Sequence, residues 1–189
     1  MEIILGSQSP RRRELMAGLG LPFSSVSIEA DESYPPNLKE ADIPYYISRA
    51  KARAYASRLE SNQLLITADT IVWCEGQMLG KPHDEEDARR MLRVLSGKTH
   101  QVFTAVTFAE KGHPLETIVD CTNVTFRVLT EEEINHYILQ YRPLDKAGAY
   151  GIQEWIGYVA CTHLSGSYFN VMGFPTHVVY SQLKKQGIL

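Results

Sequence analysis

The strongest constraint on the fold stands at the start of the chain, where an apolar run passes through a short turn into a helix. Residues 3–6 read as a strand, and the small and hydroxyl residues after them predict a turn. Pro10 suits a first helical position, because its φ is already helical and its missing N–H needs no partner there. Leu15 and Met16 share one face of a helix predicted over residues 10–19. A chain that begins strand–turn–helix is predicted to continue as an α/β fold.

Three consecutive arginines, Arg11, Arg12 and Arg13, follow that proline. Basic residues are unfavourable in the first turn of a helix, since its exposed N–H groups carry partial positive charge. A bound anion would relieve this conflict, and guanidinium groups match phosphate oxygens well. We therefore interpret the turn as a polyphosphate site, with a solvated basic helix start as the alternative. Neither G-x-x-x-x-G-K-[ST] nor G-x-G-x-x-G occurs in the chain.

Bulk composition excludes several classes of protein. Hydrophobic residues make up 44% and charged residues 22% of the 189 residues, as in ordinary globular proteins. The net charge of −3 gives no overall attraction to nucleic acid or to anionic membranes. No apolar run has the length of a membrane span, and none resembles a secretory signal. Cys74, Cys121 and Cys161 lack metal-site spacing, so we expect reduced thiols that pack as small hydrophobes in a cytoplasmic protein.

Strand and helix patterns alternate along the chain and predict a single α/β domain over residues 1–189. Two helix starts carry clear signals: Asp84 is a predicted N-cap, and Thr130 with Glu133 makes a predicted capping box. Further strands are predicted over residues 24–28, 64–67, 71–74, 101–109, 116–128 and 155–161, and further helices over residues 43–60, 84–95, 130–140 and 175–186.

Asp69 is the strongest catalytic candidate in the residue pattern. It stands between two apolar runs, 64–67 and 71–74, where an unpaired carboxylate would be costly. Such an acid persists by binding a cation, by partnering a base, or by ending a strand in a cleft, and acids at strand ends often hold metal or activate water. The alternative of a capping or turn aspartate is weak, because the residues that follow continue a strand pattern.

Further charged candidates depend on an anion site at the arginine turn. Glu32, on a loop, is a candidate ligand for Mg²⁺ or Mn²⁺ beside phosphate oxygens, and a solvated loop acid is the alternative. Lys51 and Lys81 are candidate phosphate ligands, although exposed lysines are usually only solvated charges. Lys81 has the stronger case, because its glycine and proline neighbours fix the backbone.

A glycine- and alanine-rich segment over residues 145–153 allows a flat ligand to approach the backbone closely. Gln153, at its end, carries a donor and an acceptor suited to reading the edge of a base. The alternative is a tight structural loop. A second turn-rich segment, residues 166–175, either lines the same site or caps the last helix.

Together these segments resemble the Maf family of nucleoside triphosphate pyrophosphatases. The motifs occur in the family's order and cover essentially the whole chain, which makes their joint occurrence highly specific. They are the Ser-Pro-Arg-Arg turn at 9–12 and the segments 68–70, 80–82, 95–97, 100–102, 145–148, 150–153 and 166–173.

The resemblance implies an α/β fold like that of inosine-triphosphate pyrophosphatases: elongated, with a mixed sheet and a central cleft between two lobes, and often dimeric. It implies a divalent-metal-dependent hydrolase that releases a nucleoside monophosphate and pyrophosphate. Asp69 would be the general base and, with Glu32, would hold Mg²⁺ or Mn²⁺. The matched positions make Asp69, Glu32 and Lys81 catalytic, and make Ser7, Arg11, Arg12, Lys51, Thr70 and Gln153 substrate-binding.

Within the family, the chain resembles the subgroup that acts on dTTP and UTP. Arg12, Thr70 and Gln153 match that subgroup's specificity positions, and the Tyr-Gly-Ile-Gln stretch distinguishes it from the subgroup that acts on 7-methyl-GTP. Glu154 and Trp155 depart from the small residues that usually follow, and they add bulk beside the expected base pocket.

Two other function classes compete with an enzyme. A non-catalytic nucleotide-sensing regulator of division could use the same cleft, and the retained Asp69, Glu32 and Lys81 argue against it. A single-stranded nucleic-acid binder would need a basic, aromatic-rich surface, which the sequence lacks. The expected partner is a nucleoside triphosphate, with no nucleic acid, no membrane and a possible homodimer.

Overall fold

The computed structural model describes all residues 1–189 and divides into two compact units, each assembled from separate stretches of chain. The first unit comprises Met1–Asp69, Thr104–Asp120 and Gly173–Leu189. The second comprises Thr70–Phe103 and Cys121–Met172. No helix is long and apolar enough to span a membrane.

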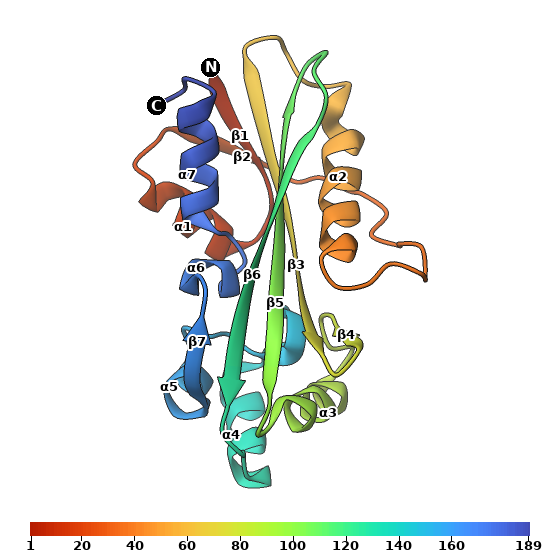
Figure 1. The fold of residues 1–189 in the computed structure, drawn as a ribbon, viewed down its shortest axis with the longest axis vertical. Coiled ribbons are helices and arrows are strands. Elements are labelled where there is room, and N and C mark those ends of the chain that lie inside the picture. Colours follow the sequence, from red (N-terminus) through yellow and green to blue (C-terminus); the bar gives the residue numbers. More distant parts are fainter. The chain divides into compact units, whose positions relative to one another are not determined.

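A seven-stranded mixed sheet confirms the predicted α/β fold. Its strand order is β2-β1-β3-β5-β6-β7, and β4 pairs with β3 outside that path. β1 pairs in parallel with β2 and β3, whereas β4 and β7 pair antiparallel with β3 and β6. The strands, drawn as arrows in Figure 1, are β1 (Glu2–Gly6), β2 (Phe23–Val26), β3 (Gln63–Cys74), β4 (Gln77–Leu79), β5 (Thr99–Glu110), β6 (Glu116–Phe126) and β7 (Cys161–Ser165).

In the first unit, two helices connect three parallel strands and lie on opposite faces of the sheet. α1 (Pro10–Gly18) joins β1 to β2, and α2 (Asp42–Ala56) joins β2 to β3. Because β1 lies between β2 and β3, the two right-handed crossovers run in opposite directions across the sheet. Figure 1 shows the result, with α7 (Thr176–Lys185) on the side of α1. The topological switch point therefore lies between β1 and β3, at the carboxyl end of β1, where open α/β sheets bind ligands.

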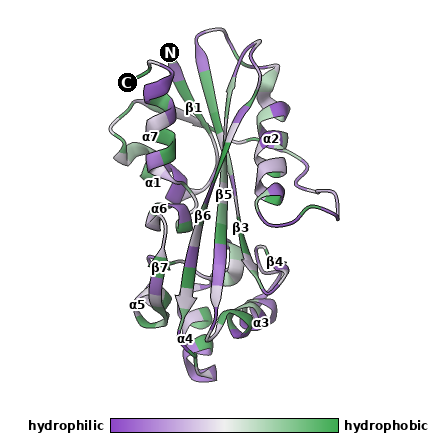
Figure 2. Cartoon of the chain, viewed as in Figure 1, coloured by the Kyte–Doolittle hydropathy of each residue, from purple (hydrophilic) through white to green (hydrophobic).

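The second unit packs its helices around a separate core. Both predicted helix starts are confirmed: the Asp84 side chain accepts the Asp87 N–H at 2.8 Å, and Thr130 and Glu133 form a capping box. Figure 2 shows hydrophilic and hydrophobic residues mixed along α3 and α4, as expected for helices with one face on a core. The helical elements are α3 (Glu85–Leu95), α4 (Glu131–Tyr141), the 3₁₀ turn η1 (Ala147–Ala149), α5 (Trp155–Ala160) and α6 (Tyr168–Val171).

Three local predictions are wrong. The strand predicted over 155–161 is helix α5, because Ile156 and Ala160 are buried at helical spacing, and a short apolar run does not distinguish the two periods. The strands predicted over 64–67 and 71–74 are one strand, β3, with Asp69 inside it. Cys121 is exposed, because side chains alternate between the two faces of β6 and this one points outward.

Candidate active site

Asp69 lies inside β3, and a lysine on α2 holds its carboxylate. The residue is only 8% exposed. Lys51 Nζ lies 2.8 Å from Asp69 Oδ1 and 2.9 Å from Glu32 Oε1, so one ammonium group bridges two acids. Burial raises the pKa of the Asp69 carboxyl, while the charges of Lys51 and Arg12 act in the opposite direction. Three predicted residues thus converge on one half-buried cluster.

Polar contacts between α2 and β3 explain how Lys51 reaches Asp69. The Thr67 hydroxyl donates to the Ser48 carbonyl at 2.8 Å, and the Ser48 and Thr107 hydroxyls are also 2.8 Å apart. Thr67 and Asp69 are two residues apart on a strand and share a face, while Ser48 and Lys51 are three residues apart on a helix. The buried hydroxyl contacts therefore fix the two elements in the register that joins acid to lysine.

Arg12 is tied to two backbone carbonyls. Its Nε donates to Gly173 O at 2.8 Å and its Nη1 donates to Ala68 O at 2.9 Å. Burial lowers the pKa of the Arg12 guanidinium, and the nearby Asp69 charge opposes this shift. Arg11 lies close enough to lower the same pKa further by repulsion. Arg12 therefore connects the N-terminal turn, β3 and the segment before α7, in addition to its expected role as a phosphate ligand.

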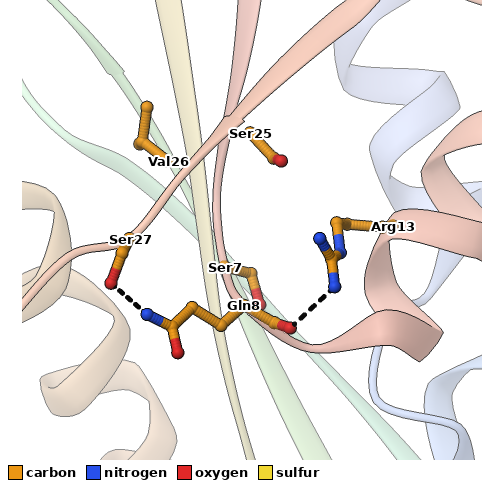
Figure 3. Close-up of a pocket in the computed structure, with 6 residues that line it drawn as sticks. All are labelled: Ser7, Gln8, Arg13, Ser25, Val26 and Ser27. Carbon is orange, nitrogen blue, oxygen red and sulfur yellow. Dashed lines mark hydrogen bonds between the residues drawn. The ribbon is translucent and has the colours of Figure 1, made fainter.

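A polar pocket of about 340 Å³ is lined by residues that follow β1, by the end of β2 and by the first turn of α1. Arg13 Nη2 donates to Gln8 O at 3.3 Å, and the Gln8 side-chain amide donates to the Ser27 hydroxyl. Figure 3 shows the Ser25 side chain pointing toward Arg13 across the pocket. The pocket contains the predicted Ser7 together with residues that the sequence did not single out; the lining residues are Ser7, Gln8, Arg13, Ser25, Val26 and Ser27.

Three predicted residues, Thr70, Lys81 and Gln153, belong to the second unit. Thr70 follows Asp69 on β3, so their side chains point to opposite faces of the sheet. Lys81 is exposed, and its loop is fixed by Gly80, whose carbonyl accepts the Gly148 N–H at 3.0 Å. The loop that carries Lys81 and the glycine-rich segment before Gln153 are therefore in direct contact within this unit.

Gln153 lies in a tight turn whose ends are joined by a hydrogen bond from the Glu154 N–H to the Gly151 carbonyl at 3.0 Å. The Gln153 Oε1 atom is buried and has no hydrogen-bond partner within the protein. An unpaired buried acceptor is costly and marks a place where a ligand can supply the missing donor. The amide predicted to read a base thus has an acceptor that no group of the protein satisfies.

The two predicted metal ligands, Asp69 and Glu32, suit a metal ion that substrate phosphates and water also coordinate better than one held by protein side chains alone. No group of three or more His, Cys, Asp or Glu side chains is arranged to hold a metal ion. The two carboxylates instead meet at Lys51. Mg²⁺ commonly binds to one or two carboxylates with substrate phosphates and water as its other ligands, and this donor set fits that pattern.

Comparison with known proteins shows what the whole chain is similar to. The family model described as Maf-like protein matches residues 2–186. A dTTP/UTP pyrophosphatase of Bacteroides thetaiotaomicron is 52% identical over 185 residues, covering 97% of this chain and 95% of the relative. Another, from Porphyromonas gingivalis, is 50% identical over 191 residues, covering 98% and 94%.

Two solved structures share the fold at low sequence identity. The Ham1 protein of Staphylococcus aureus has a TM-score of 0.59 and 11% identity, covering 98% of this chain and 100% of that one. A HAM1 protein from Coxiella burnetii has a TM-score of 0.53 and 12% identity, covering 98% and 99%. These structures support the fold alone.

Proposed function

The chain belongs to the Maf family, and on that premise we propose that it hydrolyses dTTP and UTP to the nucleoside monophosphate and pyrophosphate. The observation that carries the proposal is the buried Asp69 carboxylate, held by Lys51 and neighboured by Arg12. The relatives named dTTP/UTP pyrophosphatase, about half identical over nearly the whole chain, support the substrate class.

In the proposed reaction, Asp69 acts as the general base. Water attacks the α-phosphorus, its proton passes to the Asp69 carboxylate, and the bond from the α-phosphorus to the bridging oxygen of the β-phosphate breaks. Burial raises the pKa of Asp69 and so strengthens it as a proton acceptor. The hydrogen bond from Lys51 holds one carboxylate oxygen in place, which leaves the other to receive the proton.

The triphosphate is proposed to bind at the N-terminal turn and the lysines. Ser7, Arg11, Arg12, Lys51 and Lys81 are the proposed ligands, and positive charges there stabilise the leaving pyrophosphate. The pocket lined in part by Ser7 supports this placement, because it lies at the carboxyl ends of β1 and β2 and presents hydroxyl and guanidinium groups. When bound, Mg²⁺ or Mn²⁺ would neutralise phosphate charge, with Asp69 and Glu32 as its protein ligands.

Base selection is proposed to rest on Gln153, with Arg12 and Thr70 as further specificity residues. Uracil and thymine carry an N3–H donor that cytosine lacks, and the unpartnered Gln153 Oε1 supplies a matching acceptor. A polar pocket of this kind rejects the wrong base because its groups remain unpaired. The proposal extends to the cytoplasm as the compartment and to a homodimer as the assembly.

Pyrophosphate release from a panel of nucleoside triphosphates, with Mg²⁺ and with Mn²⁺, tests the function directly. We expect release from dTTP and UTP, much less from CTP, and almost none from the Asp69→Asn variant. Tight binding of dTTP without release by the natural chain would instead support a nucleotide-sensing regulator. Equal turnover of all nucleotides would contradict the proposed base selection.

A further inference from the structure

The turn that carries Gln153 is clamped at both ends by one tyrosine. The Tyr137 hydroxyl, from α4, accepts the Gly151 N–H at 2.9 Å and donates to the Glu154 carboxylate. Lys146 Nζ lies 3.1 Å from the other oxygen of that carboxylate. Gln153 lies between the two clamped residues, so its backbone is fixed by contacts that it does not itself make.

Packing around this network is tight. A side chain at Gly151 would place its Cβ 2.9 Å from Glu154 Cδ and 3.1 Å from Lys146 Cε, closer than carbon atoms normally approach. Tyr137 is fully buried, and burial together with the neighbouring Glu154 raises the pKa of its phenol, which therefore remains a neutral donor. The Glu154 side chain is about one-fifth exposed and the Lys146 side chain about one-tenth, so water competes little for their contact.

We propose that Tyr137 and Glu154 are positioning residues for base selection: together they hold the turn at residues 151–154 so that the Gln153 amide meets the N3–H edge of a uracil or thymine base. This inference rests on the proposed function and adds two residues to it. A side chain that recognises a base must be held in position within a fraction of an ångström by neighbouring groups. For the Gln153 amide these groups are the Tyr137 phenol and the Glu154 carboxylate. Glu154 thereby gains a specific task.

The first test compares Tyr137→Phe with Tyr141→Phe as a matched control. Tyr141 stacks on Tyr137, with ring centroids 5.1 Å apart, but its hydroxyl is not part of the clamp. We expect Tyr137→Phe to lower the preference of kcat/KM for dTTP over CTP by about fivefold, mainly through a higher KM for dTTP. Its kcat should change little, because Asp69 and Lys51 are untouched. Tyr141→Phe should leave the preference unchanged.

Glu154 variants supply a graded second test. Glu154→Gln keeps an oxygen that can accept from Tyr137 but loses the charge opposite Lys146, so it should retain more of the preference than Glu154→Ala. This pair also carries the test if Tyr137→Phe fails to fold. Equal preference in Glu154→Ala and the natural chain would overturn the proposal.

A double-mutant cycle with Gln153→Ala separates positioning from a general structural defect. If Tyr137 acts through Gln153, Tyr137→Phe should cause no further loss of preference in the Gln153→Ala background. The same proportional loss in both backgrounds would overturn the proposal.

Hydrogen exchange gives a readout that needs no turnover. Amide exchange in a peptide covering residues 148–154 should accelerate in Tyr137→Phe and not in Tyr141→Phe, because the Gly151 N–H loses its acceptor. Unchanged exchange would overturn the clamp whatever the activity. A natural chain that releases no pyrophosphate from dTTP or UTP would overturn the proposed function itself, whereas a preference for dTTP over CTP that survives Tyr137→Phe would overturn only the positioning role.

Discussion

Asp69 and Gln153 are held in place in different ways. Asp69 and its partner Lys51 stand on β3 and α2, where backbone hydrogen bonds and the buried Thr67–Ser48 contact set their positions. Gln153 stands on a turn whose geometry depends on side chains, above all Tyr137 and Glu154. The proposed proton acceptor is thus fixed by regular structure, and the proposed base-reading group by a network of side chains.

This difference suggests that the two properties can change independently. A site built on helices and strands is precise but hard to alter without damage, whereas a turn supported by side chains can be adjusted by one substitution. Substitutions in the first unit should therefore affect rate for every nucleotide, and substitutions around the turn should affect the choice among nucleotides. The variants below test that separation.

The largest expected effect is on the chemical step. Asp69→Asn keeps the size of the side chain and removes the proton acceptor, so kcat should fall by roughly 10²-fold or more for every nucleotide. Nucleotide binding and thermal stability should remain close to those of the natural chain, as measured by calorimetry. Glu60→Gln, an exposed acid in the same unit, is the control and should be fully active. Near-normal kcat in Asp69→Asn would make this residue structural.

Arg12→Ala should impair both rate and stability. The variant loses a phosphate ligand and also leaves the Gly173 and Ala68 carbonyls without their guanidinium donors, at a cost of about 1–3 kcal/mol for each group that stays unsatisfied. We expect kcat/KM to fall by about tenfold or more together with a lower Tm. Arg53→Ala, at an exposed position on α2, is the matched control. Reduced activity at an unchanged Tm would show that the hydrogen bonds from Arg12 to the two carbonyls contribute little to the stability of the fold.

Gln153→Ala should change selectivity more than rate. Loss of one desolvated hydrogen bond costs roughly 1–3 kcal/mol, so the preference for dTTP and UTP over CTP should fall by about one order of magnitude. Steady-state kinetics with the three nucleotides measures this, and Gln77→Ala, exposed on β4, is the control. An equal proportional loss for all three would remove the distinction between the two regions.

A separate expected effect concerns the acid stability of the second unit. His100 is 1% exposed, and burial lowers its pKa from 6.5 to about 4. Between those values the unfolded chain binds a proton that the folded chain does not, so stability is complete above pH 6.5 and declines as the pH falls toward 4. The loss at pH 5 should be about 2 kcal/mol. Urea unfolding at pH 7 and pH 5 should show a smaller difference for His100→Gln, and an equal difference would exclude His100 as the cause.

Capping residues in the sequence correctly predicted where two helices begin. The capping box at Thr130 and Glu133 and the N-cap at Asp84 occur as predicted, because each needs only residues three positions apart. Helix α5 was missed, because its six residues span too few turns for periodicity to distinguish helix from strand.

The sequence predicted which residues belong to the candidate site. It did not predict which of their side chains contact one another. The residue pattern and the family resemblance both pointed to Asp69 and Lys51, but their ion pair joins residues 18 positions apart and depends on how α2 packs on β3. Tyr137 carried no signal at all, since a tyrosine inside an amphipathic helix looks like any other core residue. Only the fold reveals that its hydroxyl faces Gly151.

The contact between Arg12 and Gly173, 161 residues apart, also has a consequence for synthesis of the protein. The first unit includes residues from both ends of the chain, with α7 at its C-terminal end. On the ribosome, where chains emerge N-terminus first, the arginine turn must wait until residue 173 has been made before this acceptor exists. The first unit is therefore completed only after its last stretch, Gly173–Leu189, has been made, and a chain that stops before Gly173 lacks one of the contacts that shape it.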